Sequence, residues 1–296
     1  MPRSAPGRPI SPPRAPHSDR PQVSEGGPDM SSTPEKFDAW DTKESGPADA
    51  DSRVLLLPGG MCGTVFYEDL MAAPPLASAP VRLVAATLPG HAGTTPPRDL
   101  SMENYAALAG ALAAERGCGV VVGHSIGANV ALEMAAGGHF TGPVVLLSPT
   151  FSASDEAKAL AIANGLGRVP GIGALTWIGM VKATPRVVGQ MLPPERREAL
   201  GADLAKNDPE FCRQMIRRYF DYLDRYGTLV ARLRDSGVPA WVVRGDRDEV
   251  GLTDEERAGL EASPNVTMVP VADAGHVVMV DQPDAVAELV ARVALG

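Results

Sequence analysis

One serine of this chain stands in a motif that is typical of a nucleophile. Residues 123–127 read Gly-His-Ser-Ile-Gly and match the pattern G-x-S-x-G. The motif directly follows the apolar run 119–122 and directly precedes a helical pattern over 126–136, which is the strand, turn and helix that such a motif requires. The turn is too sharp for side chains at its flanking positions, and it lifts the serine hydroxyl above the edge of a sheet. We therefore predict that Ser125 is a catalytic nucleophile.

A serine hydroxyl needs a base to activate it, and the chain has five histidines. His276 lies in a loop between the apolar run 266–271 and the last helical pattern, 281–293. Loops after the strands of a parallel sheet open at one edge, so this loop should lie beside the serine. Of the other histidines, His17 lies in the N-terminal segment and His91 follows an apolar run. His124 is directly beside the serine, and His139 follows a Gly-Gly helix stop. We predict His276 as the base.

The base needs a carboxylate that fixes its tautomer and stabilises the imidazolium. Asp246 and Asp248 both follow the apolar run 240–243, so both should lie at the same edge of the sheet. Asp248 stands farther into the loop and can reach across to His276, and we predict it as the third member. Asp246 is the alternative, although it can instead hold the turn or pair with a neighbouring arginine.

A developing oxyanion needs two hydrogen-bond donors. One is expected from the N–H of Ile126, the residue after the nucleophile. The other should come from the Gly-rich loop 58–63, which follows the first apolar run of the core, because glycines let the backbone approach a ligand closely. We predict the Met61 N–H, and a donor shifted by one residue along this loop is the open alternative.

The elements that position these residues follow from short apolar runs bounded by Gly and Pro. Such runs indicate strands buried on both faces. They lie at 54–57, 81–87, 119–122, 144–147, 240–243 and 266–271. Helical patterns alternate with them, which predicts an α/β fold with a mostly parallel central sheet flanked by helices. We expect residues 51–150 and 237–296 to form this core.

The alternation fails over residues 151–236, where helical patterns occur without a convincing strand. We predict an α-helical lid there that presents apolar surface to the site. Trp177, Tyr219 and Tyr222 are its predicted substrate-binding residues, since the two tyrosines and Tyr226 recur at spacings of three and four on one helical face. The alternative for each of them is packing against the core.

The first 50 residues differ from the rest in composition. They hold ten Pro and seven Ser, and few aliphatic residues. Such a segment cannot bury enough apolar surface to offset its ordering entropy, so we predict a disordered Pro/Ser-rich tail over residues 1–50. Met30 is a candidate for the start of translation.

Charge and cysteine content limit the partners and the compartment. The 296 residues carry a formal net charge of −9, so we expect no binding to nucleic acid or to a membrane over a broad surface. The three cysteines are widely spaced and odd in number, which offers no disulfide framework and fits a reducing cytoplasm. No motif indicates a metal or an organic cofactor, and the oligomeric state is not determined by the sequence.

Taken together, these segments resemble the α/β-hydrolase superfamily, in its lidded branch of small esterases, lipases, C–C hydrolases and peptidases. The matching segments span residues 54–296 and are Leu57-Pro58-Gly59-Gly60, Leu88-Pro89-Gly90-His91, Gly123–Gly127, Gly245–Asp248 and Ala274-Gly275-His276. The resemblance implies the α/β-hydrolase fold with a helical lid insertion, and the chain order Ser, Asp, His is that of the superfamily. The chain departs from it at Pro58-Gly59, where many relatives have His-Gly. The first two strands common in the superfamily are not evident before Val54, so the sheet is expected to be shorter at that edge.

The combined pattern predicts a serine hydrolase that cleaves a small to medium, largely apolar ester or thioester. C–C bond hydrolase, peptidase, acyltransferase and cofactor-free haloperoxidase activities use similar residues on this fold and are the alternatives. A non-catalytic binding module usually lacks a triad member, and all three are present here. A dinucleotide-binding fold is excluded because the loop 58–63 does not read G-x-G-x-x-G.

Overall fold

A seven-stranded sheet forms the centre of the structure, which is a computed structural model that describes Met1 and residues 37–296. The strand order is β1-β3-β2-β4-β5-β6-β7. The strands β2 to β7 are parallel, and β1 pairs antiparallel with β3 at one edge. The strands are β1 Thr42–Ser45, β2 Ser52–Leu57, β3 Val81–Ala86, β4 Val120–His124, β5 Val144–Leu147, β6 Ala240–Gly245 and β7 Val266–Val271. The predicted mostly parallel sheet is confirmed, and each of the six predicted apolar runs contributes one strand.

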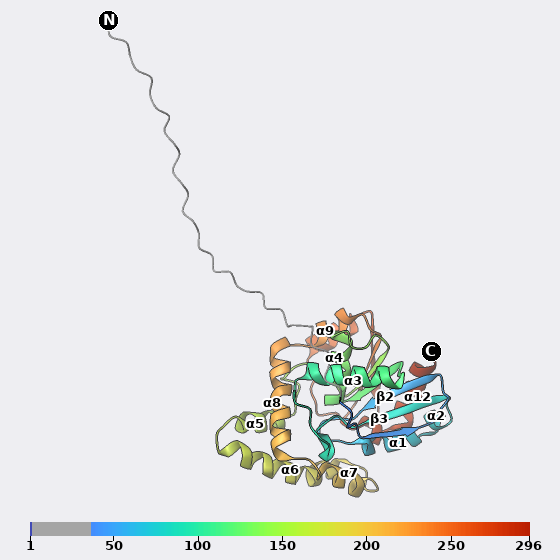
Figure 1. Cartoon of the computed structure of the whole chain (residues 1–296), viewed down its shortest axis with the longest axis horizontal. Coiled ribbons are helices and arrows are strands. Elements are labelled where there is room, and N and C mark those ends of the chain that lie inside the picture. The colour runs from blue at the N-terminus through green and yellow to red at the C-terminus, as the bar shows by residue number, and fades with distance from the viewer. Residues whose placement is uncertain (2–36) are drawn as a thin grey trace. The chain divides into compact units, whose positions relative to one another are not determined.

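Helices cover both faces of this sheet (Figure 1). On one face lie α3 (Met102–Arg116), α4 (Ile126–Ala136), α9 (Val230–Ser236) and α10 (Asp254–Glu261). On the other lie α1 (Glu68–Ala72), α2 (Pro74–Ala77), α11 (Val278–Asp281) and α12 (Pro283–Leu295). The inner strands are therefore buried on both sides, which is why their sequences are continuous apolar runs rather than alternating ones.

The connection between β5 and β6 is the predicted helical insertion. It contains α5 (Lys158–Gly167), α6 (Ile172–Met191), α7 (Arg197–Leu204) and α8 (Pro209–Tyr226), and no strand. Pro209 opens α8 and Asp208 caps it, with its side chain accepting a hydrogen bond from the Phe211 N–H. The last helix before β6, α9, packs against α4 and α10. The end of the predicted 151–236 lid therefore belongs to the helix layer on the sheet.

The predicted boundary of the tail at residue 50 is wrong, because residues 42–45 form β1. This strand reads Thr-Lys-Glu-Ser, without an apolar run, since it lies at the sheet edge and its side chains are half-buried or exposed. It is held by the ladder to β3 and by the Glu44 carboxylate, which pairs with Arg82 and Arg116 at 2.7 and 2.6 Å. Residues 2–36 of the predicted disordered tail, which include His17 and Met30, lie outside the described residues.

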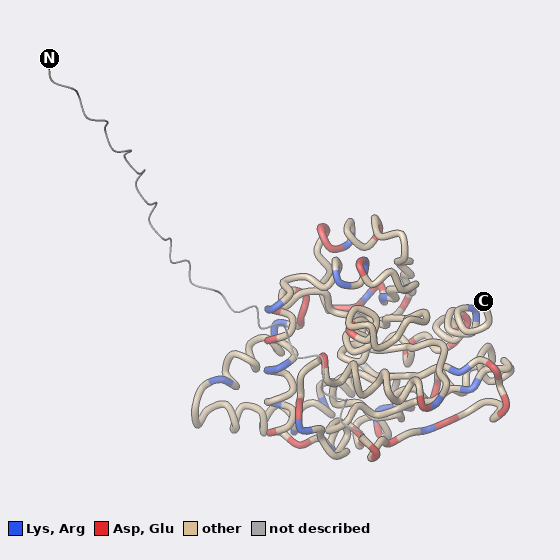
Figure 2. The backbone as a smooth tube through the Cα atoms, turned by 45° about the horizontal axis from the view of Figure 1, so that its top comes forward, with Lys and Arg blue, Asp and Glu red and all other residues tan. Residues whose placement is uncertain are grey.

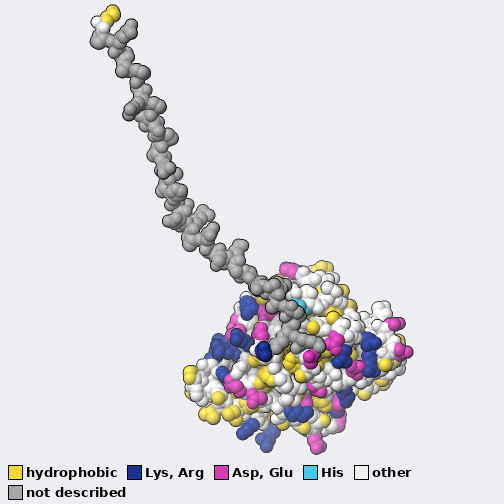
Figure 3. Space-filling model, viewed as in Figure 1, with side chains coloured by type: hydrophobic (Ala, Val, Ile, Leu, Met, Phe, Trp, Pro, Cys, Tyr) yellow, Lys and Arg dark blue, Asp and Glu magenta, His cyan; other side chains and the backbone are white. Residues whose placement is uncertain are grey.

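The insertion keeps an unusual share of apolar side chains in solvent. Among residues 37–296, the exposed large hydrophobic side chains are Ile162, Leu166, Val169, Ile172, Leu175, Ile178, Val187 and Leu295, and all but the last belong to α5, α6 or the turn between them. Figure 3 shows hydrophobic side chains at the edge where Figure 1 places these helices. Charged residues are sparse there and interspersed in sign over the rest of the described chain (Figure 2).

None of the helices in the described part of the chain is long and apolar enough to cross a membrane.

Removal of β1 is expected to destabilise the fold. A chain that begins at Asp51 loses this strand and leaves β3 as an unpaired edge, so its free energy of unfolding should be roughly 2–4 kcal/mol lower, at about 1 kcal/mol for each lost ladder hydrogen bond, and it should aggregate more readily. The matched control is a chain that begins at Phe37, which keeps β1. Equal urea midpoints for the two truncated chains would show that β1 contributes nothing.

Candidate active site

The predicted site residues all follow strands of the parallel sheet at their carboxyl ends. Ser125 follows β4, Asp248 follows β6 and His276 follows β7, while the loop 58–63 follows β2. Because these strands are parallel and adjacent in the order β2-β4-β5-β6-β7, their carboxyl ends meet at one edge of the sheet. Chain segments that are far apart in sequence are thereby brought to one place.

Ser125 sits in a strained turn between β4 and α4. Its φ is 50° and its ψ is −121°, a backbone region that costs about 1–3 kcal/mol for a residue with a side chain. Neighbouring glycines make the turn possible: a Cβ on Gly123 would lie 2.2 Å from the Gly127 carbonyl oxygen, and one on Gly127 would lie 2.3 Å from the Leu57 carbonyl oxygen. Both glycines are therefore required by close packing of α4 on its surroundings. The Ser125 N–H donates to the Leu147 carbonyl at 2.9 Å, which ties the turn to β5.

Asp248 and His276 form a hydrogen-bonded pair. His276 Nδ1 lies 3.0 Å from Asp248 Oδ1, and the Asp248 side chain is fully buried while that of His276 is 24% exposed. Burial alone would raise the pKa of the Asp248 carboxyl, but the hydrogen bond with His276 lowers this pKa to about 2. The carboxylate therefore accepts from Nδ1–H, which leaves Nε2 as the acceptor nitrogen of the ring.

Asp246, the alternative, does not contact His276. Its side chain is 53% exposed, and its Oδ1 accepts a hydrogen bond from the Ala274 N–H at 3.3 Å. Asp246 thus holds the turn that leads to the histidine loop.

His124, next to the serine, has a positioning contact that the sequence does not reveal. Its Nε2 donates to the His276 carbonyl oxygen at 2.9 Å, and its side chain is buried. Burial, together with the neighbouring His276, lowers the pKa of His124 to about 3, so the ring stays neutral and keeps this donor. The residue beside the nucleophile therefore fixes the backbone of the predicted base.

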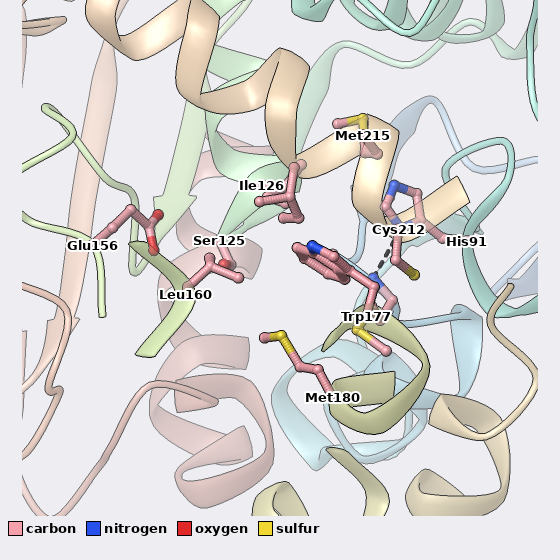
Figure 4. Close-up of a pocket in the computed structure, with 12 residues that line it drawn as sticks. His91, Ser125, Ile126, Glu156, Leu160, Trp177, Met180, Cys212 and Met215 are labelled. Atoms are coloured by element: carbon pink, nitrogen blue, oxygen red, sulfur yellow. Dashed lines mark hydrogen bonds between the residues drawn. The ribbon is translucent and has the colours of Figure 1, made fainter. Parts of the chain in front are cut away.

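The predicted oxyanion donor Met61 is corrected. Its N–H donates to Nδ1 of His91 at 2.8 Å, the dashed line in Figure 4, and so is already used. The Gly60 N–H has no hydrogen-bond partner among the described residues, and Ile126 is the first residue of α4, where an N–H has no partner within the helix. A Cβ on Gly60 would lie 2.7 Å from Ile126 Cδ1, so the two residues are in close contact. The open alternative, a donor shifted by one residue along the loop, is the one that this arrangement supports.

Side chains of the insertion form hydrogen bonds to the backbone of the loop 58–63. Asn207 Nδ2 donates to the Met61 carbonyl at 2.7 Å, and its Oδ1 accepts from the Ala92 N–H at 2.9 Å. Asp203 Oδ2 accepts from the Gly63 N–H at 2.6 Å. Both side chains are buried and come from α7 and the turn after it. No motif marks them, because they act through backbone atoms of a loop about 140 residues earlier.

Two cavities meet at Ser125. The smaller, of about 130 Å³, is drawn in Figure 4, and the larger has a volume of about 440 Å³. Both are lined by Gly60, Met61, Ser125, Leu160 and Met180. The smaller cavity adds His91, Ile126, Glu156, Trp177, Cys212, Met215 and Ile216. The larger adds His276 and apolar residues that include Phe66, Val187, Val188, Leu204 and Val277. A group attached to the serine can therefore extend in two directions.

Of the predicted substrate-binding residues, Trp177 lines the smaller cavity, whereas Tyr219 and Tyr222 line neither. The expectation for the two tyrosines is corrected. The Tyr222 hydroxyl donates to Glu133 of α4 at 2.9 Å, and the Tyr219 hydroxyl donates to Glu156 at 2.7 Å. Their shared helical face packs on the core because acceptors for both hydroxyls lie there.

Comparison with known proteins agrees with this architecture. A family model described as Alpha/beta hydrolase family matches residues 54–289. No curated protein matches the chain in sequence. Among solved structures, the chain is similar to MenH from S. aureus, with a TM-score of 0.66, 16% identity, and coverage of 87% of this chain and 98% of that one. It is also similar to a thermophilic esterase from Thermogutta terrifontis, with a TM-score of 0.65, 20% identity, and coverage of 86% and 94%. A putative ancestral haloalkane dehalogenase gives a TM-score of 0.66, 17% identity, and coverage of 87% and 96%.

Acid should destabilise the fold through His91. Burial lowers its pKa from 6.5 to about 4, so below pH 6.5 the unfolded chain binds a proton here that the folded chain does not. The contribution of His91 to the free energy of unfolding is therefore fully present above pH 6.5. As the pH drops from 6.5 toward 4, the free energy of unfolding falls by up to about 1.4 kcal/mol per pH unit.

His91→Gln keeps an acceptor for the Met61 N–H but cannot titrate, so its free energy of unfolding, measured in urea between pH 7.5 and 4.5, should decline less steeply than that of the wild type. His139→Gln is the matched control, since His139 is exposed, and should leave the slope unchanged. Parallel slopes for wild type and His91→Gln would contradict the assignment.

Proposed function

The chain belongs to the alpha/beta hydrolase family, and on that premise we propose that it is a serine hydrolase that cleaves an ester or thioester through an acyl-enzyme on Ser125. One observation carries this proposal: a buried carboxylate, Asp248, holds His276 by a 3.0 Å hydrogen bond at the sheet edge where Ser125 occupies a strained turn. A nucleophile, a base and a group that orients the base are the three parts that acyl transfer requires.

The proposed reaction has two halves. Ser125 Oγ attacks the carbonyl carbon while His276 Nε2 takes the hydroxyl proton, and the Asp248 carboxylate stabilises the imidazolium. The carbon–oxygen or carbon–sulfur bond to the leaving group then breaks, and His276 returns the proton to that group. Water, activated by the same nitrogen, attacks the acyl-enzyme, releases the carboxylic acid and restores the Ser125 hydroxyl.

The oxyanion formed in each half would be stabilised by the N–H groups of Gly60 and Ile126. The two residues are in contact, and the start of α4 adds the positive end of a helix dipole. The hydrogen bond from the Met61 N–H to His91 fixes the orientation of Met61, the residue that follows Gly60 in the loop. His91 would thus act as a positioning residue for the Gly60 donor.

The two cavities divide the substrate between them. His276 must protonate the leaving group and lines only the larger cavity, so we place the alcohol or thiol there. The acyl chain then enters the smaller cavity beside Ile126 and Trp177. Its volume of about 130 Å³ is close to that of a cavity of roughly 150 Å³ that binds one benzene molecule, so it has room for about five non-hydrogen atoms. We therefore propose a substrate with a short acyl chain and a larger apolar leaving group.

The roles of the two loop aspartates can be separated by mutation. Asp248→Asn removes the acceptor for His276 Nδ1–H and favours the wrong tautomer of His276. The kcat on p-nitrophenyl butanoate should therefore fall by roughly 10⁴, as it does in a serine protease with the same arrangement of catalytic residues. The matched control Asp246→Asn should retain kcat within a few-fold. The proposal fails if Asp246→Asn is the variant whose kcat falls by this amount, or if Ser125→Ala retains activity.

The cavity assignment predicts different chain-length profiles for the two halves of the ester. With p-nitrophenyl esters, kcat/KM should rise from acetate by up to fourfold per methylene, at about 0.8 kcal/mol each, reach a maximum near butanoate or pentanoate, and then fall. With acetate esters of linear alcohols, the rise should continue to longer chains. An acyl profile that keeps rising to decanoate while the alcohol profile is flat would reverse the assignment, and thioester and amide analogues in the same assay determine which bond is cleaved.

A further inference from the structure

The smaller cavity contains one carboxylate that the proposed reaction does not use. Glu156 lines it together with the apolar side chains of Leu160, Trp177, Met180 and others. Figure 4 shows the Glu156 carboxylate turned toward the side on which Ser125 and Leu160 lie. Neither Lys nor Arg is among the residues that line this cavity or the larger one.

The Glu156 carboxylate is held in one orientation by two hydroxyl groups. Its Oε1 accepts hydrogen bonds from Thr150 Oγ1 and from Tyr219 Oη, each at 2.7 Å. Thr150 and Tyr219 are both buried, and burial raises the pKa of Tyr219, which keeps its hydroxyl a donor. The second oxygen, Oε2, has no hydrogen-bond or ion-pair partner among the described residues. The structure thus fixes one oxygen and leaves the other available at the cavity wall.

Glu156 is half-buried, and its Oε2 is not among the buried polar atoms without a partner, so this oxygen is open to solvent. A ligand that fills the cavity displaces that solvent and leaves the carboxylate oxygen beside apolar surface, which is unfavourable unless the ligand itself brings a donor or a cation. We propose that Glu156 binds a protonated amine on the acyl part of the substrate, and that the preferred substrates are esters or thioesters of short amino acids. This inference rests on the proposed function, because it places the acyl group in the smaller cavity.

The size of the cavity sets the length of the acyl group. A volume of about 130 Å³ accommodates an acyl chain of about five non-hydrogen atoms, so the ammonium group should lie two or three carbons from the carbonyl. A charge-assisted hydrogen bond in such surroundings contributes enough to change a rate or binding constant roughly 10- to 100-fold.

The test compares esters that match in shape and differ in charge. Benzyl 3-aminopropanoate and benzyl butanoate have the same number of chain atoms, and release of benzyl alcohol from each gives kcat/KM by chromatography. The wild-type enzyme should prefer the amine ester by roughly 10-fold or more. Glu156→Gln, which keeps an acceptor for Thr150 and Tyr219, should abolish this preference. Glu198→Gln, an exposed glutamate of α7 outside both cavities, is the matched control and should retain it.

The outcomes separate this inference from the proposed function. If benzyl butanoate is cleaved in a Ser125-dependent reaction but the amine ester is not preferred, the role of Glu156 is overturned and the proposed function stands. If neither ester is cleaved, the proposed function fails, and binding decides the role of Glu156. Calorimetry with propylammonium and with propanol should then show tighter binding of the cation to the wild type than to Glu156→Gln. Equal binding of the two probes, or equal binding to both proteins, would overturn the inference.

Discussion

The arrangement of the site depends on the strained backbone of Ser125. A φ of 50° at this residue turns the chain from the end of β4 into the first turn of α4 within one residue. Gly123 and Gly127 have to lack side chains because α4 passes so close to the turn and to the carbonyl of Leu57. The same closeness brings the start of α4 against the loop after β2. One backbone constraint therefore places the nucleophile and both proposed oxyanion donors.

Two buried neutral histidines secure the loops around this turn. His124 donates to the backbone of His276, and His91 accepts from the backbone of Met61. Burial lowers the pKa of both rings, to about 3 and about 4. Neutrality is essential to these contacts, since a protonated His91 could not accept a hydrogen bond at Nδ1. His276 differs from them in having a buried carboxylate as its partner and partial exposure to the larger cavity.

The sequence predicts the elements with strong local signals and misses those with distant partners. Apolar runs bounded by Gly and Pro mark the six parallel strands, and the order of loops along the chain brings Ser125, Asp248 and His276 to one edge. The edge strand β1 has no such signal, because a half-exposed strand needs no apolar run. The position of Met61 in the loop predicts it as a donor, but its N–H is hydrogen-bonded to His91, 30 residues away. The spacing of Tyr219 and Tyr222 predicts a shared face, but it cannot say that acceptors on Glu156 and Glu133 hold that face against the core.

If Ser125 carries the acyl group during turnover, the acyl-enzyme can be trapped and identified. The enzyme is mixed with excess p-nitrophenyl butanoate, quenched in acid within the first turnover, digested and analysed by mass spectrometry. A burst of nitrophenolate and a butanoyl group on the peptide that contains Ser125 are expected, with neither in Ser125→Ala. Turnover without an adduct on Ser125 in a fully quenched sample, or an adduct on another residue that persists in Ser125→Ala, would contradict this role of Ser125.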